Sequence, residues 1–326
     1  MENRELERKV NDAKKLLNDV KAEVSKKIVG QVPMIDGLLM GIIAGGHVLV
    51  EGVPGLAKTL AVRTLSEALT IDFKRIQFTP DLLPADLTGT MIYRQQTGEF
   101  VARKGPVFTN IVLADEINRA PAKVQAALLE SMAEKQVTIG DNTYSLPRPF
   151  FVLATQNPIE QEGTYQLPEA QLDRFVMKLK IDYPSAAEEL EILKKMGSEN
   201  DIAINRVLNT ITLDQLRKAA ESITVDERIE KYIVSIVTAS RATDQKHLSF
   251  IRYIEYGASP RATIYLYRCA KVKALFEGRT FVLPEDVKAV AYDVLRHRIV
   301  LSYEAQAEEL STDDVIKDIL AAVSVP

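Results

Sequence analysis

The chain has 326 residues, of which 46% are hydrophobic and 26% are charged, and this balance excludes a largely disordered protein. At roughly 150 residues per domain, the length suggests two domains. The formal net charge is −4, from 41 basic and 45 acidic residues, which argues against a surface devoted to nucleic acid or anionic lipid. One cysteine, Cys269, and three widely spaced histidines argue against a disulfide framework and against a cysteine- or histidine-based metal centre.

The N-terminal segment 1–15 is charged and polar, and it lacks the apolar stretch of a secretory signal peptide. The longest apolar stretch, 37–50, is too short to span a bilayer and is interrupted by glycines and His47. We therefore expect a soluble, cytoplasmic protein whose histidines are surface residues or hydrogen-bonded core residues.

From residue 47 to about residue 184, short apolar runs alternate with stretches of helical periodicity. Several of the runs are almost entirely apolar, which is typical of strands that are covered on both faces. The predicted strands are 47–50, 73–78, 110–114, 150–154 and 175–181, and the predicted helices between them include 59–69 and 124–135. This alternation predicts an α/β fold in which a mostly parallel sheet lies between two layers of helices.

Two further pairs of short strands interrupt this pattern, and each pair flanks a turn sequence. The segments 91–93 and 99–102 surround Gln96-Thr97-Gly98, and the segments 136–139 and 143–146 surround Gly140-Asp141-Asn142. Turn residues between short strand-like segments predict two hairpins. Neither hairpin belongs to a minimal parallel sheet, so each is either a surface addition or a functional element.

After residue 185 the strand signals fade and helical spacing dominates. The predicted helices of this half are 186–196, 213–222, 227–243, 261–277 and 284–298. We therefore expect an α/β domain over residues 1–184 and a smaller all-helical domain over residues 185–326, joined by a linker at about 184–212.

The sharpest motif follows the first predicted strand and precedes the first predicted helix. It reads Gly52-Val53-Pro54-Gly55-Leu56-Ala57-Lys58-Thr59 and resembles the Walker A pattern G-x-x-x-x-G-K-[ST]. Glycines let such a loop wrap an anion with backbone N–H groups, and the following helix N-terminus adds its dipole. The pattern predicts that Lys58 contacts the β- and γ-phosphates of ATP and that the Thr59 hydroxyl is a ligand of Mg²⁺.

One residue departs from this pattern, since Ala57 stands where the pattern has glycine. A methyl group is tolerated there if the residue keeps a helical φ angle, because the backbone N–H group remains available to the phosphate. We therefore expect Ala57 to have a helical or near-helical conformation.

A second motif ends the third predicted strand, where Ile111-Val112-Leu113-Ala114 is followed by Asp115 and Glu116. An apolar strand that ends in two acids is the Walker B pattern. We expect Asp115 to bind Mg²⁺, directly or through water, and Glu116 to orient and polarise the attacking water. The two carboxylates can have different roles because successive residues of a strand face opposite ways.

The next predicted strand ends in the polar sequence Thr155-Gln156-Asn157-Pro158. Parallel strands bring their C-terminal ends to one crevice, where ligands bind. We therefore expect Asn157 to lie beside the γ-phosphate and to help to hold the water. The alternative is that Asn157 and Pro158 only form a turn.

Together these residues resemble the AAA+ ATPases, and further matches extend over nearly all of residues 22–300. Ile28-Val29-Gly30-Gln31 is similar to the family's segment that lines the adenine pocket. Leu172-Asp173-Arg174-Phe175 is similar to its arginine-finger box, and Gly257-Ala258-Ser259-Pro260-Arg261-Ala262 is similar to its sensor 2 element, in which Arg261 begins a lid helix. The residues assigned to nucleotide binding are Val29, Gly30, Gly52, Val53, Pro54, Gly55, Leu56, Ala57, Lys58, Thr59 and Leu60.

Within that family the chain resembles the MoxR group most. Gly55-Leu56-Ala57-Lys58-Thr59 is the loop variant of that group, and the stretches 115–120 and 125–130 are also similar to it. The two predicted hairpins match in position the helix-2 insert and the pre-sensor-1 hairpin of the wider clade. The resemblance implies a ring, expected to be a hexamer, that uses ATP hydrolysis to remodel or mature client proteins. Cofactor or metal insertion, and a partner with a von Willebrand factor A domain, are implied in the same way.

The resemblance also implies which arginines supply positive charge to the transition state. Arg174 is expected on the nucleotide of the neighbouring subunit, where such a residue is worth roughly 10³–10⁵ in kcat, so hydrolysis should depend on assembly. The alternative for Arg174 is an ion pair with Asp173. Arg261 is expected to contact the γ-phosphate, in cis or in trans, and Arg119 is a further candidate for facing a neighbour.

Three other functions stay open from the sequence. No residue of this chain distinguishes a MoxR-type ATPase from a magnesium-chelatase-like motor subunit. A DNA helicase is less favoured, because Gln136–Leu146 contains Asp141 and no Lys or Arg, whereas a hairpin that follows DNA needs cations for the phosphates. A scaffold that binds ATP without hydrolysis is disfavoured by the intact Lys58, Asp115 and Glu116. Neither the client nor the ring size is determined.

Overall fold

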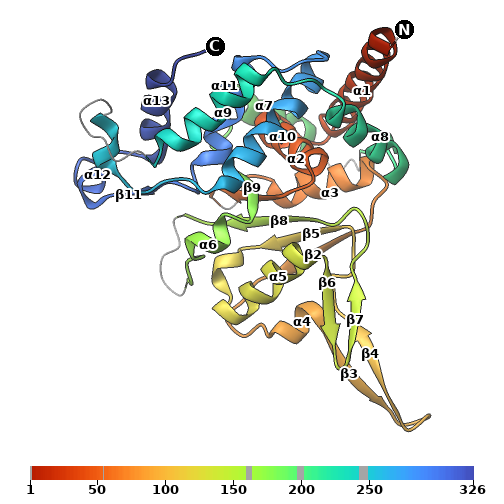
Figure 1. Ribbon diagram of the computed structural model, residues 1–326. Helices are drawn as coiled ribbons and strands as arrows, with labels where there is room; N and C mark the ends of the chain where they lie inside the picture. The colour runs from red at the N-terminus through yellow and green to blue at the C-terminus, as the bar shows by residue number, and fades with distance from the viewer. Residues whose placement is uncertain (1, 54, 159–163, 197–201, 242–248) are drawn as a thin grey trace.

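The computed structural model describes residues 2–53, 55–158, 164–196, 202–241 and 249–326. Within these residues, five parallel strands form one sheet in the order β2-β5-β8-β1-β9 (Figure 1). The strands are β1 (His47–Glu51), β2 (Phe73–Gln77), β5 (Ile111–Asp115), β8 (Phe151–Gln156) and β9 (Phe175–Lys180). The parallel sheet and all five strands predicted from the sequence are confirmed.

The sheet is covered on both faces, which explains why its strands are almost entirely apolar. Successive residues of β1 point to opposite faces, so Val48 and Val50 belong to one hydrophobic cluster and Leu49 to the other. One face packs against α2 (Val32–Ala44) and α3 (Lys58–Ala68), and the other packs against α4 (Pro84–Thr88) and α5 (Ala122–Glu134) (Figure 1). The chain is therefore a three-layer α/β/α structure, as predicted.

Two helices that were not predicted from the sequence precede β1. The first, α1 (Glu2–Val24), is amphipathic and buries Val10, Leu17 and Val24. The second, α2, is apolar on nearly every face, because it lies between the sheet and the C-terminal helices α8 and α10. A helix that is buried on all sides has no amphipathic periodicity, so its sequence resembles a short apolar run.

The C-terminal half is helical and lies on the side of α2 (Figure 1). Its helices are α7 (Ala186–Met196), α8 (Thr210–Glu221), α9 (Glu227–Ala239), α10 (Pro260–Glu277), α11 (Pro284–Leu295), α12 (Tyr303–Ala307) and α13 (Thr312–Ala322). All five helices predicted for this half are present. A short α6 (Glu169–Leu172) precedes β9, and two short strands that were not predicted from the sequence, β10 (Ile254–Tyr256) and β11 (Val300–Leu301), form an antiparallel pair.

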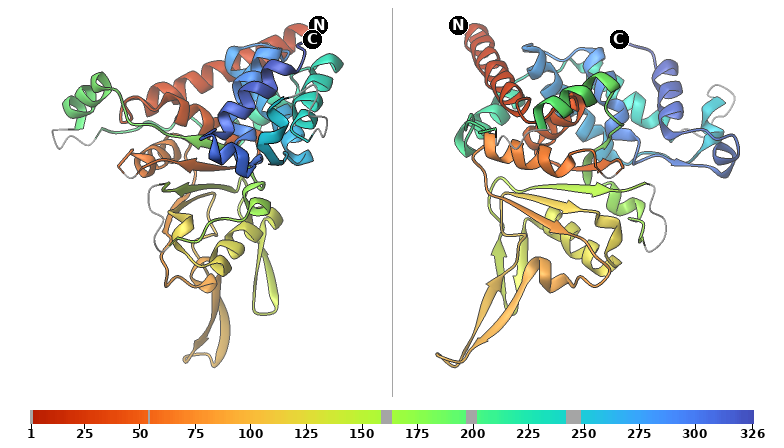
Figure 2. Two further views of the ribbon diagram at one scale, coloured as in Figure 1. Left: turned by 90° about the vertical axis from the view of Figure 1, so that its left-hand side faces the viewer. Right: turned by 180° about the vertical axis from the view of Figure 1, so that it is seen from behind.

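Both predicted hairpins are confirmed, and both extend from the sheet on the side away from the C-terminal helices (Figures 1 and 2). The first pairs β3 (Gly89–Arg94) with β4 (Glu99–Lys104), and the second pairs β6 (Gln136–Ile139) with β7 (Asn142–Ser145). Near the tip of the first hairpin the rings of Tyr93 and Phe100 face each other at 5.2 Å and are both largely exposed. Among the described residues, no helix combines the length and apolar character needed to cross a membrane.

His47 begins β1 and is a hydrogen-bonded core residue, one of the two roles expected for it. Its Nδ1 accepts a hydrogen bond of 3.0 Å from the backbone N–H of Val152, so Nε2 carries the proton and donates to the carbonyl of Met132 at 3.2 Å. Burial lowers the pKa of His47 to about 4. The imidazole is therefore neutral in the folded chain and takes up a proton more readily when the chain unfolds.

This difference predicts a pH dependence of stability. The unfolded chain gains a proton on His47 near the usual pKa of about 6.5, whereas the folded chain gains it only near 4, so stability falls as the pH drops through this window. Between pH 7 and pH 5 His47 alone should cost about 2 kcal/mol of unfolding free energy. Urea unfolding at both pH values should show a smaller decrease for His47→Asn than for the wild type, and equal decreases would contradict the assignment.

Candidate active site

The Walker A loop connects the end of β1 to the start of α3 at Lys58 (Figure 1). Gly55 has a φ of 87°, which a residue with a side chain rarely adopts. The ammonium group of Lys58 extends back over the loop and donates a hydrogen bond of 2.6 Å to the carbonyl of Gly52. Pro54 lies outside the described residues. The loop therefore lies between the first strand of the sheet and the following helix, as the sequence predicted.

The expectation for Ala57 was wrong. Ala57 has φ 54° and ψ 21°, a left-handed conformation, and it is the N-cap residue at which the chain turns from the loop into α3. This conformation costs a residue with a β-carbon on the order of 1 kcal/mol. The loop thus holds strain at the position where the general pattern has glycine.

The two acids of the Walker B strand lie at the C-terminal end of β5. Asp115 is 8% exposed, and its Oδ2 lies 3.5 Å from the hydroxyl of Thr59. Its Oδ1 accepts a hydrogen bond of 2.6 Å from the hydroxyl of Thr155, and that hydroxyl accepts a bond of 2.8 Å from the backbone N–H of Glu116. One buried hydroxyl on β8 therefore fixes both the carboxylate of Asp115 and the start of the segment after it.

Two polar side chains of β2 extend this cluster. Arg75 donates to Asp115 Oδ2 from Nε at 3.0 Å and from Nη2 at 2.6 Å. Gln77 donates to Glu116 Oε2 at 2.8 Å, and Arg119 Nη1 donates to the same oxygen at 3.1 Å. The carboxylate of Glu116 is thus held toward β2, and Arg119 contacts its own chain.

Arg75, Gln77 and Thr155 were not identified as site residues from the sequence. The available signal was that each is a polar residue near the C-terminal end of a predicted strand. That signal has no value without the strand order, because only neighbouring strands can bring such residues together.

Lys58 is half-buried next to these acids. Burial lowers the pKa of Lys58, and the negative charges of Asp115 and Glu116 act in the opposite direction. The ammonium group of Lys58, the hydroxyl of Thr59 and the carboxylate of Asp115 fit the chemistry of a nucleoside triphosphate bound with Mg²⁺. Hydroxyl and carboxylate oxygens are the ligands that Mg²⁺ prefers, and it is normally held by one or two carboxylates together with phosphates.

Asn157 follows β8 and is 6% exposed. It lines an open pocket of about 700 Å³ at the same end of the sheet. Lys178 of β9 and Glu51 at the end of β1 also line this pocket, and they form an ion pair of 2.6 Å. The structure therefore places Asn157 at the C-terminal edge of the sheet, where the sequence predicted it.

The residues predicted to line the adenine site lie between α1 and α2. Val29 is buried, and Gly30 has a φ of 64°. A β-carbon on Gly30 would come within 2.5 Å of the carboxylate of Glu188, so this segment lies directly against α7. Of the apolar residues assigned to nucleotide binding, Leu56 is buried, and Val53 of the loop and Leu60 of α3 are partly buried against the larger hydrophobic cluster.

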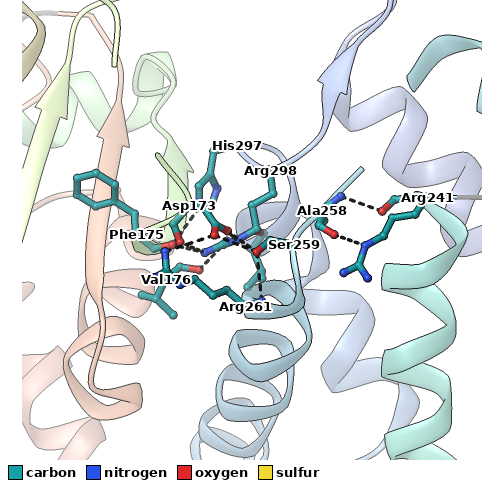
Figure 3. Close-up of polar contacts among 11 residues, drawn as sticks. Asp173, Phe175, Val176, Arg241, Ala258, Ser259, Arg261, His297 and Arg298 are labelled. Carbon is teal, nitrogen blue, oxygen red and sulfur yellow. Dashed lines mark hydrogen bonds and ion pairs between the residues drawn. The ribbon is translucent and has the colours of Figure 1, made fainter. Parts of the chain in front are cut away.

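Arg174 directly follows Asp173 in the chain, and Arg261 contacts the carboxylate of Asp173 (Figure 3). The guanidinium of Arg174 donates a hydrogen bond of 2.6 Å to the carbonyl of Leu129 on α5. Asp173 instead accepts from Ser259, Arg261 and Arg298 of the C-terminal half. Arg261 is half-exposed and lies 3.5 Å from Asp173 Oδ2.

Comparison with known proteins identifies the family to which this chain is similar. Residues 47–177 match the model of the ATPase family associated with various cellular activities (AAA), and residues 252–319 match the AAA lid domain. The chain is 49% identical over 305 residues to Chaperone MoxR1 of Mycobacterium tuberculosis, covering 93% of this chain and 81% of that protein. It is 30% identical over 323 residues to Protein MoxR of Methylorubrum extorquens, covering 93% of each.

The chain belongs to the MoxR family of AAA+ ATPases. The crystal structure of a candidate ATPase from Cytophaga hutchinsonii, 52% identical in sequence, superposes with a TM-score of 0.93 and covers 100% of this chain and 99% of that one. The MoxR family assignment made from the loop variant at Ala57 is therefore confirmed. The same comparisons support the general type of protein that the sequence predicted, a chaperone-related AAA+ ATPase with a core and a lid.

In this MoxR-family chain the hydroxyl of Thr155 should be needed for catalysis. Thr155→Val keeps the shape of the side chain but removes the donor to Asp115 and leaves the N–H of Glu116 without its acceptor. We expect ATP turnover to fall on the order of 10- to 100-fold, with ATP still bound. Phosphate release with increasing ATP measures this, Thr155→Ser is the control that keeps the hydroxyl, and unchanged turnover of the valine variant would contradict the role.

Proposed function

We propose that the chain hydrolyses ATP to ADP and phosphate with Mg²⁺ as its cofactor, in a homo-oligomeric ring. The observation that supports this most directly is the 3.5 Å approach of the Thr59 hydroxyl to the carboxylate of Asp115, with Glu116 next in the chain. These groups come from two separate segments, and their meeting at one edge of the sheet is what phosphoryl transfer to water requires.

Each residue of the site has a role in this reaction. The backbone N–H groups of residues 55–59 and the ammonium group of Lys58 would bind the phosphates. Thr59 and Asp115 would hold Mg²⁺, whose charge offsets that of the phosphates. Glu116 would orient the attacking water, which requires it to leave Gln77 and Arg119, and Asn157 would hold the same water.

The transition state of phosphoryl transfer needs further positive charge, which we propose comes from a neighbouring subunit. Arg174 extends from the segment before β9 and would contact the nucleotide of the next subunit after leaving the carbonyl of Leu129. Arg261 would contact a γ-phosphate from the start of α10, in cis or in trans. We propose that the ring has six subunits and is located in the cytoplasm. In each subunit, residues 1–184 would form the core and residues 185–326 the lid.

We further propose that the ring remodels or matures client proteins, including cofactor or metal insertion, with a von Willebrand factor A domain protein as a candidate partner. The name of the relative Chaperone MoxR1 supports this role. The two hairpins support it as well, because they extend away from the lid and one of them exposes Tyr93 and Phe100. Hairpins in this position would be the contact surface for a client.

The first test concerns hydrolysis itself. Glu116→Gln should bind ATP and lose nearly all phosphate release, because the amide cannot accept a proton from water. Phosphate release measures turnover, and a fluorescent ATP analogue measures binding. An unchanged rate above background would exclude Glu116 from catalysis. Phosphate release at background level from both the wild type and the variant would instead favour a scaffold that only binds ATP. The same variant should retain client proteins in a pull-down from the source cells.

The second test concerns assembly. Arg174→Ala should lower kcat by roughly 10³-fold or more with ATP binding retained, since it removes charge from the transition state. Mixing it with Lys58→Ala, which keeps Arg174 but cannot grip phosphate, should restore part of the activity, because each variant supplies what the other lacks. Absence of recovery in rings shown to be mixed, or rapid turnover by a monomer, would contradict hydrolysis in trans.

A further inference from the structure

The C-terminal half holds the segment 173–176 through one buried arginine (Figure 3). Arg298 follows α11, and its side chain is 0% exposed. The segment that it contacts connects α6 to β9 and contains Arg174. The position of Arg174 therefore depends on residues of the lid as well as on its own β-strand.

All five N–H donors of Arg298 are used, and four of their acceptors belong to this segment. Nε donates to Asp173 Oδ1 at 2.9 Å, and Nη2 donates to the carbonyl of Asp173 at 3.1 Å and to that of Phe175. Nη1 donates to the carbonyl of Val176 at 3.3 Å and to that of Val294 on α11. Lysine has only three donors and no planar fork, so it could not reproduce this set.

The same carboxylate is also bound by the start of α10. Ser259 is the N-cap residue of α10, and its hydroxyl lies 2.9 Å from both carboxylate oxygens of Asp173. The backbone N–H of Arg261 points at that hydroxyl at 3.2 Å, and the guanidinium of Arg261 lies 3.5 Å from Asp173 Oδ2. Asp173 thus connects the helix that carries Arg261 to the residue directly before Arg174.

These contacts differ in strength, which gives them different roles. The contact of Arg298 with Asp173 is short, buried and part of a complete set of hydrogen bonds. The contact of Arg261 is long, and its side chain is 52% exposed, so it can leave Asp173 at little cost. A movement of Arg261 toward a phosphate would therefore leave Asp173 fastened to the lid through Arg298 and Ser259.

We propose that Asp173, Arg298 and Ser259 are positioning residues that couple the orientation of the lid to the position of Arg174. The lid of one subunit would then control hydrolysis in the next subunit, because Arg174 moves with it. This inference rests on the proposed function, since it requires Arg174 to act in trans. The simpler alternative is that the buried pair only holds the lid on the core.

Mixed rings separate these two possibilities. Wild-type subunits are combined with an excess of Glu116→Gln subunits, which cannot hydrolyse ATP but still present Arg174 to their neighbours. The Glu116→Gln subunits carry either no second change, or Arg174→Ala, or Asp173→Asn, or Asp286→Asn. All phosphate release then comes from the wild-type subunits, and fluorescent labels verify equal incorporation.

Asp286 is a matched control because its carboxylate is also buried and paired with an arginine. Its side chain is 2% exposed and accepts from Arg279 at 2.5 and 2.6 Å, but both residues belong to the C-terminal half. Asp286→Asn therefore imitates the loss of a buried charge pair without touching the segment of Arg174. Thermal unfolding of each variant shows whether the two changes destabilise the chain comparably.

We expect the rings with Asp173→Asn to have a kcat per wild-type subunit at least fivefold below that of rings with Glu116→Gln alone, at unchanged KM for ATP. Arg174→Ala should give the lowest rate, and Asp286→Asn should leave the rate unchanged. If Asp173→Asn subunits do not enter rings, Ser259→Ala should lower the rate in the same direction, and Ser259→Thr should restore it.

Three outcomes would overturn the inference, in two distinguishable ways. In the first, rings with Asp173→Asn, or with Ser259→Ala in its place, have the same rate as rings with Glu116→Gln alone, while rings with Arg174→Ala have a low rate. Hydrolysis in trans would then stand, and the buried pair would have only a structural role. The same conclusion follows if Asp286→Asn lowers the rate as much as Asp173→Asn. No effect of Arg174→Ala would instead contradict the proposed action of Arg174 in trans, and the inference would fall with it.

Discussion

The hydroxyl of Thr155 is the contact on which the rest of the site depends. It donates to the carboxylate of Asp115 and accepts from the backbone N–H of Glu116, and it can do so only because β8 lies beside β5 in the sheet. The neighbour of β8 on its other side is β1, which leads into the Walker A loop. β8 thus lies between the strand that leads into the Walker A loop and the strand that ends in Asp115. A change in the register of β8 would separate the Thr155 hydroxyl from both Asp115 and Glu116.

A second connection, at Asp173, lies between the sheet and the lid. Arg298 surrounds the segment that contains Arg174 with hydrogen bonds, and Ser259 ties the start of α10 to the same carboxylate. The buried guanidinium of Arg298 is compensated by the carboxylate of Asp173 at 2.9 Å. The hairpins extend from the opposite side of the sheet, so the molecule separates the parts proposed to sense nucleotide from those proposed to contact a client.

Much of the fold could be predicted because its strands are buried on both faces and therefore read as apolar runs, as in β5 and β8. The helix α2 could not, since burial on every side removed its periodicity, and α1 was passed over as a charged segment although it buries one face. The conformation of Ala57 was predicted wrongly, because the local preference of alanine for a helical φ is overridden at the turn into α3. Arg75 and Gln77 were missed because nothing local distinguishes them from the exposed residues of an edge strand.

The sequence by itself determined the chemistry of the site and the family, since a phosphate-binding loop and a strand that ends in two acids need particular residue types at fixed spacing. Only the tertiary structure decided which residues support that chemistry. Strand order brings Thr155 to Asp115, and lid packing brings Arg298 to Asp173, across 40 and 125 residues of chain respectively. Contacts of that kind depend on how separate elements pack, and neither composition nor periodicity along the chain contains that information.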